Sequence, residues 1–333
     1  MNMKAIFFGN QKEDLLRVYA ADTKKRIEGM TGASPALYSA EDLGKVDFTD
    51  VKYLFTTWGM AALSEAEIKQ YFPALECVFY AAGSVQNFAR PFLKCGVKVF
   101  SSWKANAVPV IEYALAQIIL ASKGFYRLAR MTKESYLNAA QELQNYPGNY
   151  NTNVGILGDG AIGGEVIKRL KRDYKLNVYV YSITMSRERA EELGVRLSSL
   201  EEIFSECSVI SNHLANNEKT QGIINSALLN KMQPYTTFIN TGRGAQVDEA
   251  ALTSVLERDS TVTAVLDVTN PEPPAAGSKL YSLPNVILTP HIAGSSGNEV
   301  QRMAEYMADE AERYLKGEAL LYEVTEKMLE LMA

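Results

Sequence analysis

The segment Val154-Gly-Ile-Leu-Gly-Asp-Gly-Ala-Ile-Gly163 decides the fold of this chain. Its first four residues form a short apolar run, as expected of a buried strand, and apolar side chains then recur at helical spacing from Ile162 to Leu170. Glycines occupy the turn between strand and helix. A buried strand, a glycine-rich turn and a helix in this order are typical of the first unit of a doubly wound α/β sheet.

The spacing Gly-x-Gly-x-x-Gly also predicts what the turn binds. Gly158 permits the tight turn, Gly160 lets the backbone approach a pyrophosphate, and Gly163 lets the helix pack closely on the sheet. The anion is expected at the N-terminus of the helix. The candidate cofactor-binding residues are therefore Gly158, Gly160, Ala161, Ile162 and Gly163. The alternative is a plain strand–helix turn that merely requires glycine.

A second part of the dinucleotide pattern is missing. An acidic residue about 20 residues further on normally binds the adenosine ribose. Here the second strand, expected at 177–181, is followed by Ser182. Serine does not repel a 2′-phosphate, and Arg187 and Arg189 follow closely enough to pair with one. The alternative is that both arginines are solvated on a helix surface, so the sequence leaves NAD(H) and NADP(H) equally open.

Strand and helix patterns alternate on both sides of this segment, which predicts parallel sheets built from βαβ units. The strands are expected at 4–8, 53–56, 77–80, 97–100, 153–157, 177–181, 208–211, 237–240, 262–267 and 286–288. The helices are expected at 12–26, 64–71, 86–94, 108–127, 162–172, 186–193, 248–258 and 298–315, with Pro109 in a first turn and a loop around Pro147-Gly148. A chain of 333 residues exceeds one compact core and suggests two domains.

Composition argues against several classes of function. The net charge is −5 without a dense Lys/Arg run, so we expect no binding of nucleic acid and no attraction to an anionic membrane. The cysteines are scattered, which argues against disulfides and a metal site and predicts small buried thiols at Cys77, Cys95 and Cys207. The longest apolar stretch, 107–121, is too short and too polar to span a bilayer, and the N-terminus lacks a signal-peptide pattern, so a cytoplasmic chain is expected.

Three chemically active residues follow three of the later strands. Arg243 lies in a glycine-bracketed turn after 237–240, Glu272 follows 262–267, and His291, one of only two histidines, follows 286–288. Because ligands of open α/β sheets bind beyond the carboxyl ends of the strands, these residues are expected to converge on one crevice. Imidazole is the usual proton carrier near neutral pH, and guanidinium binds carboxylates with two parallel hydrogen bonds.

Together these motifs resemble those of the D-isomer-specific 2-hydroxyacid dehydrogenases, the family of glyoxylate/hydroxypyruvate reductase and of glycerate and phosphoglycerate dehydrogenases. The resemblance covers nearly the whole chain and is weakest over residues 1–100. Besides 154–163, the matching segments are Ile239-Asn-Thr-Gly-Arg-Gly-Ala-Gln-Val-Asp248, Leu266-Asp-Val268 with Pro271-Glu-Pro273, and Asn285-Val-Ile-Leu-Thr-Pro-His-Ile-Ala-Gly294. The resemblance implies an NAD(P)-dependent oxidoreductase that acts on a small 2-oxo or 2-hydroxy acid.

Roles for individual residues follow from the resemblance. His291 is expected to act as acid and base, Glu272 to orient it, and Arg243 to bind the substrate carboxylate. Consecutive amides at Gly83 and Ser84 are expected to bind the same carboxylate. His213 is expected to pack or hydrogen-bond near the cofactor rather than to transfer a proton. The further residues expected near the cofactor are Ser182, His213, Thr241, Gly242 and Asp267.

The resemblance also implies the architecture. A Rossmann dinucleotide-binding domain, 105–295, is expected to be inserted into a flavodoxin-like substrate domain formed by 1–104 and 296–333. Two chains are expected to form a homodimer mainly through the Rossmann domain.

Two other functions stay open on the same fold. Certain transcriptional corepressors share it and keep the catalytic residues, although the absence of a tail after Met332 disfavours this reading. Oxidation of formate or phosphite is the other, although formate dehydrogenases of this type resemble longer chains. The sequence does not predict which 2-oxo acid is the substrate.

Overall fold

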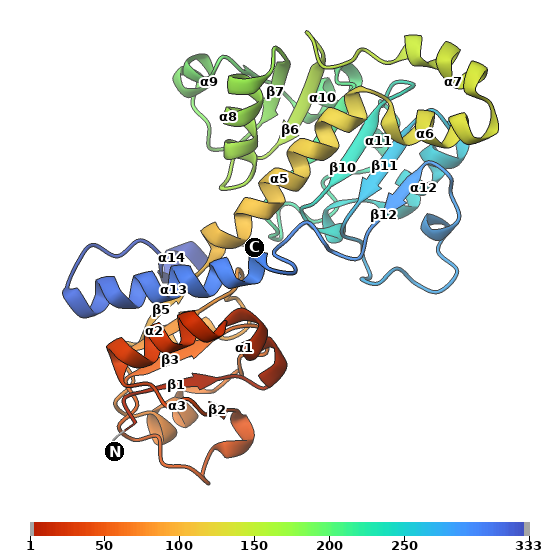
Figure 1. Cartoon of the computed structure of the whole chain (residues 1–333). Helices are drawn as coiled ribbons and strands as arrows, with labels where there is room; N and C mark the ends of the chain where they lie inside the picture. The colour runs from red at the N-terminus through yellow and green to blue at the C-terminus, as the bar shows by residue number, and fades with distance from the viewer. Residues whose placement is uncertain (1–2, 330–333) are drawn as a thin grey trace. The chain divides into compact units, whose positions relative to one another are not determined.

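The computed structural model describes residues 3–329, which fold into two compact units (Figure 1). The central unit is Val108–Gly294, and the terminal unit comprises the described residues up to Ala107 together with those from Ser295 onward. The chain therefore starts one unit, builds the other, and then returns to complete the first. Its two crossing points follow residues 107 and 294, compared with 104 and 295 in the sequence prediction.

A six-stranded sheet forms the terminal unit, in the order β13-β5-β4-β3-β1-β2. The strands are β1 (Ala5–Phe8), β2 (Leu37–Tyr38), β3 (Tyr53–Thr56), β4 (Cys77–Tyr80), β5 (Lys98–Ser101) and β13 (Glu323–Val324). The helices are α1 (Lys12–Val18), α2 (Ala21–Thr31), α3 (Glu65–Tyr71), α4 (Ala89–Lys94), α13 (Glu299–Lys316) and α14 (Glu326–Leu329). The parallel strands have the flavodoxin-like order 2-1-3-4-5, and β13 pairs with β5 in the antiparallel sense.

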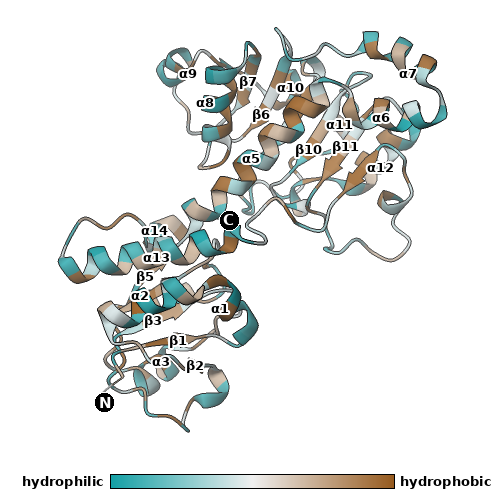
Figure 2. Ribbon diagram, viewed as in Figure 1, coloured by the Kyte–Doolittle hydropathy of each residue, from teal (hydrophilic) through white to brown (hydrophobic). Residues whose placement is uncertain are grey.

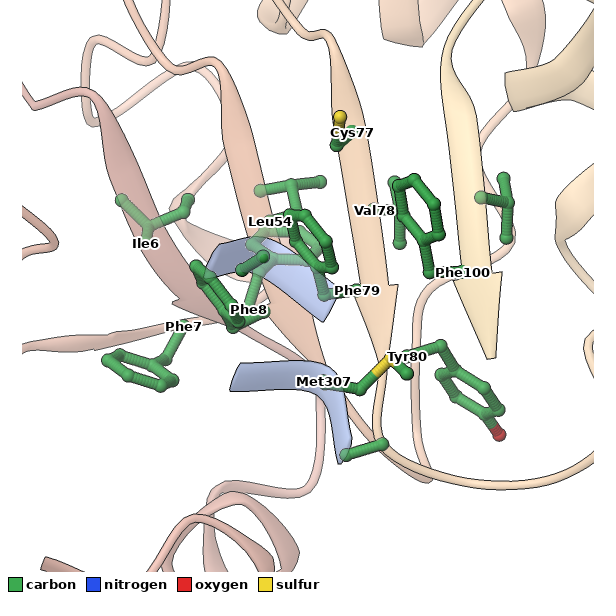
Figure 3. Packing of buried hydrophobic residues seen from close by; sticks show 14 of the residues in the cluster. Ile6, Phe7, Phe8, Leu54, Cys77, Val78, Phe79, Tyr80, Phe100 and Met307 are labelled. Atoms are coloured by element: carbon green, nitrogen blue, oxygen red, sulfur yellow. The ribbon is translucent and has the colours of Figure 1, made fainter. Parts of the chain in front are cut away.

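Aromatic side chains form the centre of the terminal unit. Phe79 on β4 stacks on Phe55 at a ring-centroid distance of 5.0 Å and on Phe100 at 4.9 Å. Met307 from α13 belongs to the same buried cluster (Figure 3). Burial of one such side chain contributes ~1.5–3 kcal/mol. Because α13 follows the central unit in the chain, this core needs segments from both ends of the sequence.

The central unit contains a seven-stranded sheet in the order β12-β11-β10-β9-β6-β7-β8, with every neighbouring pair parallel. The strands are β6 (Asn153–Leu157), β7 (Asn177–Tyr181), β8 (Arg196–Leu197), β9 (Val209–Asn212), β10 (Thr237–Asn240), β11 (Thr263–Leu266) and β12 (Val286–Leu288). The helices are α6 (Phe125–Glu134), α7 (Tyr136–Glu142), α8 (Gly163–Asp173), α9 (Arg187–Leu193), α10 (Leu200–Glu206), α11 (Ser226–Leu229) and α12 (Glu249–Arg258). This is the Rossmann strand order with one strand added, so the expected α/β class is confirmed.

The helix after the glycine turn shows how the sequence pattern becomes structure. α8 buries Val166, Ile167 and Leu170, which lie three and four residues apart. Its opposite face is hydrophilic (Figure 2). Glu165 in the first turn and Arg172 in the last turn complement the helix dipole. The predicted bounds, 162–172, are therefore correct to one residue.

The prediction of a single helix at 108–127 is wrong at both ends. Helix α5 runs over Trp103–Ser122 and contains Pro109 in its interior rather than in its first turn. The helical conformation is interrupted at Gly124, whose φ of 67° is left-handed. A Cβ on this glycine would lie 2.4 Å from the ring of Tyr146. Helices α6 and α7, which the sequence did not predict, then follow, and the loop expected around Pro147-Gly148 is present.

Helix α5 also differs from the expectation on membrane spanning. By length and composition it is long and apolar enough to cross a bilayer. Half of its apolar window is nevertheless buried inside the structure, and Ala105, Ala114 and Ile118 are fully buried. Core helices of globular proteins have the same composition, so this helix is weak evidence for a membrane span.

The remaining differences are local. The helix expected at 12–26 divides into α1 and α2 because Tyr19 turns into the core, where its hydroxyl donates to the backbone oxygens of Thr56 and Phe79. The short edge strands β2, β8 and β13 were not predicted, since two residues carry no readable alternation. Cys77 and Cys207 are buried as expected, whereas Cys95 is only half-buried.

Candidate active site

Three neighbouring strands of the central sheet carry the predicted catalytic residues at one edge. Arg243 follows β10, Glu272 follows β11, and His291 follows β12. The order β12-β11-β10 makes these strands neighbours, and all of them run parallel. Their carboxyl ends therefore lie at the same edge of the sheet, where open α/β folds bind ligands.

His291 and Glu272 are in direct contact. Nδ1 of the imidazole lies 2.7 Å from Oε1 of the carboxylate. The His291 side chain is 46 % exposed and that of Glu272 is 43 % exposed, so both remain accessible from solvent. His291 has a φ of 56°, in the left-handed region, and its amide donates to the backbone oxygens of Asp267 and Thr289. The structure thus brings two of the predicted residues together. Their contact uses Nδ1 of the imidazole and not Nε2.

Asp267 holds the loop that carries His291. Its carboxylate is buried, and Oδ1 accepts hydrogen bonds from the Thr289 hydroxyl at 2.6 Å and from the Ile292 amide at 2.8 Å. Oδ2 accepts from the amide of Ala293 at 2.9 Å. Each hydrogen bond of the Asp267 carboxylate therefore goes to the segment around His291. Contact between Asp267 and a cofactor stays a prediction.

A buried network of amide side chains shapes the turn of Arg243. Oε1 of Gln246 accepts from the Arg243 amide at 3.2 Å and from Nδ2 of Asn212 at 2.7 Å. Oδ1 of Asn240 accepts from Nδ2 of Asn212 and from the Gly242 amide. These three amide side chains are at most 1 % exposed. Because nearly every polar atom in the network has a partner, the network fixes the backbone from which the guanidinium projects.

The guanidinium of Arg243 makes one hydrogen bond of its own, from Nη1 to the backbone oxygen of Gly242 at 2.8 Å. No ion pair to Arg243 occurs within residues 3–329. Its turn packs directly on the loop of Glu272, at Gly244 and Thr269. Arg243 therefore lies at the same edge of the central sheet as Glu272 and His291, but it forms no hydrogen bond with either of them.

The glycine turn after β6 fits a dinucleotide. A Cβ on Gly158 would lie 2.8 Å from the backbone oxygen of His213, and one on Gly163 would lie 2.0 Å from the backbone oxygen of Gly158. Both positions therefore require glycine for close packing. At Gly160 a Cβ would meet nothing within 4 Å, so the backbone there faces open space that a pyrophosphate can approach. Ala161 next to it is exposed.

His213 lies between this turn and the turn after β10. Its Nε2 lies 2.9 Å from the Ser211 hydroxyl, and its Nδ1 lies 3.4 Å from the Thr241 hydroxyl. Desolvation lowers the pKa of His213 to about 4. Its imidazole is therefore neutral at pH 7, which suits packing beside a cofactor rather than proton donation.

Ser182 follows β7, as the sequence predicts, but it has a partner that the sequence did not indicate. Its hydroxyl donates to Oδ1 of Asp159 at 2.5 Å, and Asp159 is the residue between the first two glycines of the turn. Arg189, one of the two arginines near Ser182 in sequence, pairs with Glu192 on the exposed surface of α9.

The residues predicted to bind the substrate carboxylate lie in the terminal unit, after β4. The hydroxyl of Ser101 donates to the backbone oxygens of Ala82 and Gly83, at 3.0 and 2.6 Å. Within the described residues the amides of Gly83 and Ser84 donate no hydrogen bond. This arrangement holds the turn by its carbonyl groups and leaves its donors unused.

Sequence reasoning missed Asn212, Asn240 and Gln246 because amides are usually exposed. A signal was present: Asn212 and Asn240 each end a buried apolar strand, where a polar side chain needs a buried partner. The contact of Asp159 with Ser182 was likewise not indicated, because one residue lies inside the glycine turn and the other follows the second strand.

Comparisons with known proteins show the family of this chain. The model of the family described as D-isomer specific 2-hydroxyacid dehydrogenase, NAD binding domain, matches residues 115–293. D-3-phosphoglycerate dehydrogenase from Archaeoglobus fulgidus is 30 % identical over 258 residues, which is 76 % of this chain and 48 % of that protein. Glyoxylate reductase from Korarchaeum cryptofilum is 29 % identical over 257 residues, which is 76 % of this chain and 77 % of that protein.

The chain spans about half, or less, of the length of the phosphoglycerate dehydrogenases it matches. Among solved structures, the holo form of D-mandelate dehydrogenase from Rhodotorula graminis has a TM-score of 0.79 at 20 % identity, covering 98 % of this chain and 99 % of that one. At this identity the likeness shows the fold. The family model covers more than half of the sequence, and the chain therefore belongs to the D-isomer specific 2-hydroxyacid dehydrogenase family.

Proposed function

We propose that this chain is a nicotinamide-dependent D-2-hydroxyacid dehydrogenase that works as a 2-oxoacid reductase. The observation that carries the proposal is the 2.7 Å contact between His291 and Glu272, at the edge of the sheet that also carries the glycine turn. A proton carrier with a carboxylate partner and a dinucleotide turn in one unit supply the two parts of such a reaction.

The residues that would hold the cofactor are those of the turn after β6, from Gly158 to Gly163, with His213 and Thr241 beside them. When bound, a reduced nicotinamide supplies a hydride to the carbonyl carbon of the substrate. The exposed backbone at Gly160 and the N-terminus of α8 would bind the pyrophosphate.

His291 would move the proton. With Nδ1 directed to Glu272, Nε2 is the nitrogen that would give its proton to the carbonyl oxygen as the 2-oxo acid becomes a 2-hydroxy acid. In the reverse direction the neutral ring would accept that proton. Glu272 would keep Nδ1 protonated, fix the ring orientation, and stabilise the imidazolium.

Arg243 would bind the substrate carboxylate. Its guanidinium has no carboxylate partner within the described residues, so its charge is available to an anionic substrate. A planar guanidinium can hold a carboxylate with two parallel hydrogen bonds and so limit the orientations of the neighbouring carbonyl. The unused amides of Gly83 and Ser84 form a second candidate site for the same group.

The two units suggest separate roles. The central unit, which holds the glycine turn and the three active residues, corresponds to the proposed Rossmann domain at 105–295. The terminal unit corresponds to the proposed substrate domain at 1–104 and 296–333.

A homodimer is supported by the surface of α6 and α7. Tyr136 and Leu137 on α7 are 72 % and 73 % exposed, and Phe125 on α6 and Leu143 just after α7 are about half exposed. Large apolar side chains gathered on two consecutive helices are typical of a surface that another chain covers. Light scattering of the purified chain should give the mass of two chains, and Leu137→Asp should shift it towards the mass of one; a wild-type monomer would exclude the dimer.

The central experiment is a reduction screen of the purified chain with glyoxylate, hydroxypyruvate, pyruvate and larger 2-oxo acids, each with NADH and NADPH. At least one acid should be reduced to the D-2-hydroxy acid. His291→Ala should keep its affinity for the dinucleotide and lose ~10²–10⁴-fold in turnover. If no acid is reduced, or if the variant turns over like the wild type, the proposed function is wrong.

A further inference from the structure

Asp159 occupies an unusual position, inside the glycine turn and against the end of the second strand. Its Oδ1 accepts hydrogen bonds from the Ser182 hydroxyl at 2.5 Å and from the Thr184 hydroxyl at 2.9 Å. The Ser182 oxygen in turn accepts from the amides of Thr184 and Met185, at 3.0 and 2.9 Å. The carboxylate is therefore fixed to the loop after β7.

The second oxygen of this carboxylate is still available. Oδ2 of Asp159 has no hydrogen-bond partner within residues 3–329, and the side chain is only half-buried. Next to Ser182 the side chain of Ile183 is 86 % exposed. An unpaired carboxylate oxygen beside an exposed apolar side chain offers an acceptor and an apolar surface at the same place.

In dinucleotide folds the end of the second strand faces the adenosine ribose, and an acidic residue there binds the 2′-hydroxyl. This chain has Ser182 at that point. The contact between Ser182 and Asp159 brings a carboxylate to the same place from the first strand–helix turn instead. The negative charge that is missing from the sequence after the second strand is therefore supplied there by the Asp159 carboxylate.

On the basis of the proposed function, we propose that Asp159 selects the adenosine ribose with a free 2′-hydroxyl, so that the chain uses NAD(H) in preference to NADP(H). Oδ2 accepts the hydrogen bond of the 2′-hydroxyl. A 2′-phosphate has no proton to donate there at neutral pH and brings its negative charge against the carboxylate, which disfavours binding.

Arg189 does not offset this repulsion. Arg189 is paired with Glu192 at 2.8 Å, and Arg187 and Arg189 are both exposed on α9. An exposed arginine already paired with a carboxylate contributes little to the binding of a further anion.

The test is equilibrium binding, which does not depend on turnover. Dissociation constants are measured for NADH and NADPH by nicotinamide fluorescence. They are also measured by calorimetry for ADP-ribose and its 2′-phosphorylated form, which lack the nicotinamide. The wild type should bind each unphosphorylated ligand at least ~10-fold more tightly than its 2′-phosphorylated counterpart. Higher salt should narrow the difference, because the repulsion is screened.

Asp159→Asn keeps the shape and an acceptor for Ser182 and Thr184 but removes the charge. We expect the preference for the unphosphorylated ligand to fall to within ~3-fold in this variant. Asp173→Asn, at the exposed C-terminal end of α8, is the matched control and should leave the preference unchanged.

Each outcome decides the matter. A wild type that binds NADPH as tightly as NADH, or an Asp159→Asn variant with an unchanged preference, overturns this inference while leaving the proposed function intact. Binding of neither dinucleotide overturns both. Should the variant not fold, a wild-type ratio near one still overturns the inference, and a ratio that narrows at higher salt still supports the charge repulsion.

Discussion

Gly244 lies directly against the backbone of Thr269. A Cβ on Gly244 would stand 2.0 Å from the carbonyl carbon of Thr269 and 2.5 Å from the amide nitrogen of Asn270. The turn after Arg243 and the loop before Glu272 therefore touch through main-chain atoms, and only glycine permits the contact. This packing fixes the separation between the proposed carboxylate clamp and the proposed acid–base pair.

Gly244→Ala should separate these two loops. Relief of the overlap requires a backbone shift, which costs ~1–3 kcal/mol of stability and misplaces Arg243 relative to His291. We expect at least a ~10-fold loss in kcat/KM for a 2-oxo acid, with the dinucleotide dissociation constant changed less. Gly29→Ala is the matched control, because a Cβ there meets nothing within 4 Å and the position is inside α2. Unaltered kinetics and stability of Gly244→Ala would show that the contact does not constrain the site.

Glu272→Gln should weaken the acid–base pair without disturbing the cofactor turn. The imidazolium loses its charged partner at 2.7 Å, and the amide can present either an acceptor or a donor to Nδ1. Because both side chains are nearly half exposed, solvent replaces part of the lost interaction, so a fall in kcat of about 10-fold is expected rather than a complete loss. Stopped-flow measurement of hydride transfer and fluorescence titration of the dinucleotide separate the two effects.

The control for this variant is Glu257→Gln, which removes an exposed carboxylate paired with Lys279 elsewhere in the central unit. It should behave as the wild type in both measurements. Equal turnover of Glu272→Gln and the wild type would mean that Glu272 does not assist His291.

Asp267→Asn tests whether Asp267 positions the His291 loop. The carboxylate accepts hydrogen bonds from Thr289, Ile292 and Ala293, whereas an amide group would direct N–H groups at one or more of these donors. A buried donor left without an acceptor costs ~1–3 kcal/mol. We expect a lower unfolding midpoint in urea together with a loss in kcat, since the loop that holds His291 is released.

The readout that separates positioning from simple destabilisation is kcat under conditions where the variant is fully folded. If kcat recovers to the wild-type value at low temperature while the unfolding midpoint stays reduced, Asp267 has only a structural role.

The sequence predicts regular features of this chain better than its irregular ones. The central strands at 153–157, 177–181 and 237–240 match the structure in both bounds, because the middle residues of each strand are buried and mostly apolar. The break of the long helix at Gly124 could not be read in the same way. It depends on the ring of Tyr146, which is brought to that glycine only by tertiary folding.

The same distinction applies to the site. His291, Glu272 and Arg243 can be found from sequence because their positions after parallel strands predict a common edge. The Asp159–Ser182 contact could not be found, because it joins two turns 23 residues apart through side-chain hydrogen bonds alone. The buried amides that support Arg243 are likewise a three-dimensional network without a sequence period.

His213 should make the stability of the central unit depend on pH. Its pKa of about 4 in the folded chain lies below the ~6.5 of an unfolded histidine. Between these pH values the unfolded chain binds one more proton, so acid favours unfolding. The contribution of the neutral, desolvated ring is therefore fully present above pH ~6.5 and is lost as the pH falls towards 4, by at most ~1.4 kcal/mol per pH unit. Urea denaturation from pH 7 to 4.5 measures this slope, and His213→Asn should reduce it. If wild type and variant lose stability in parallel over this range, the titrating group is not His213.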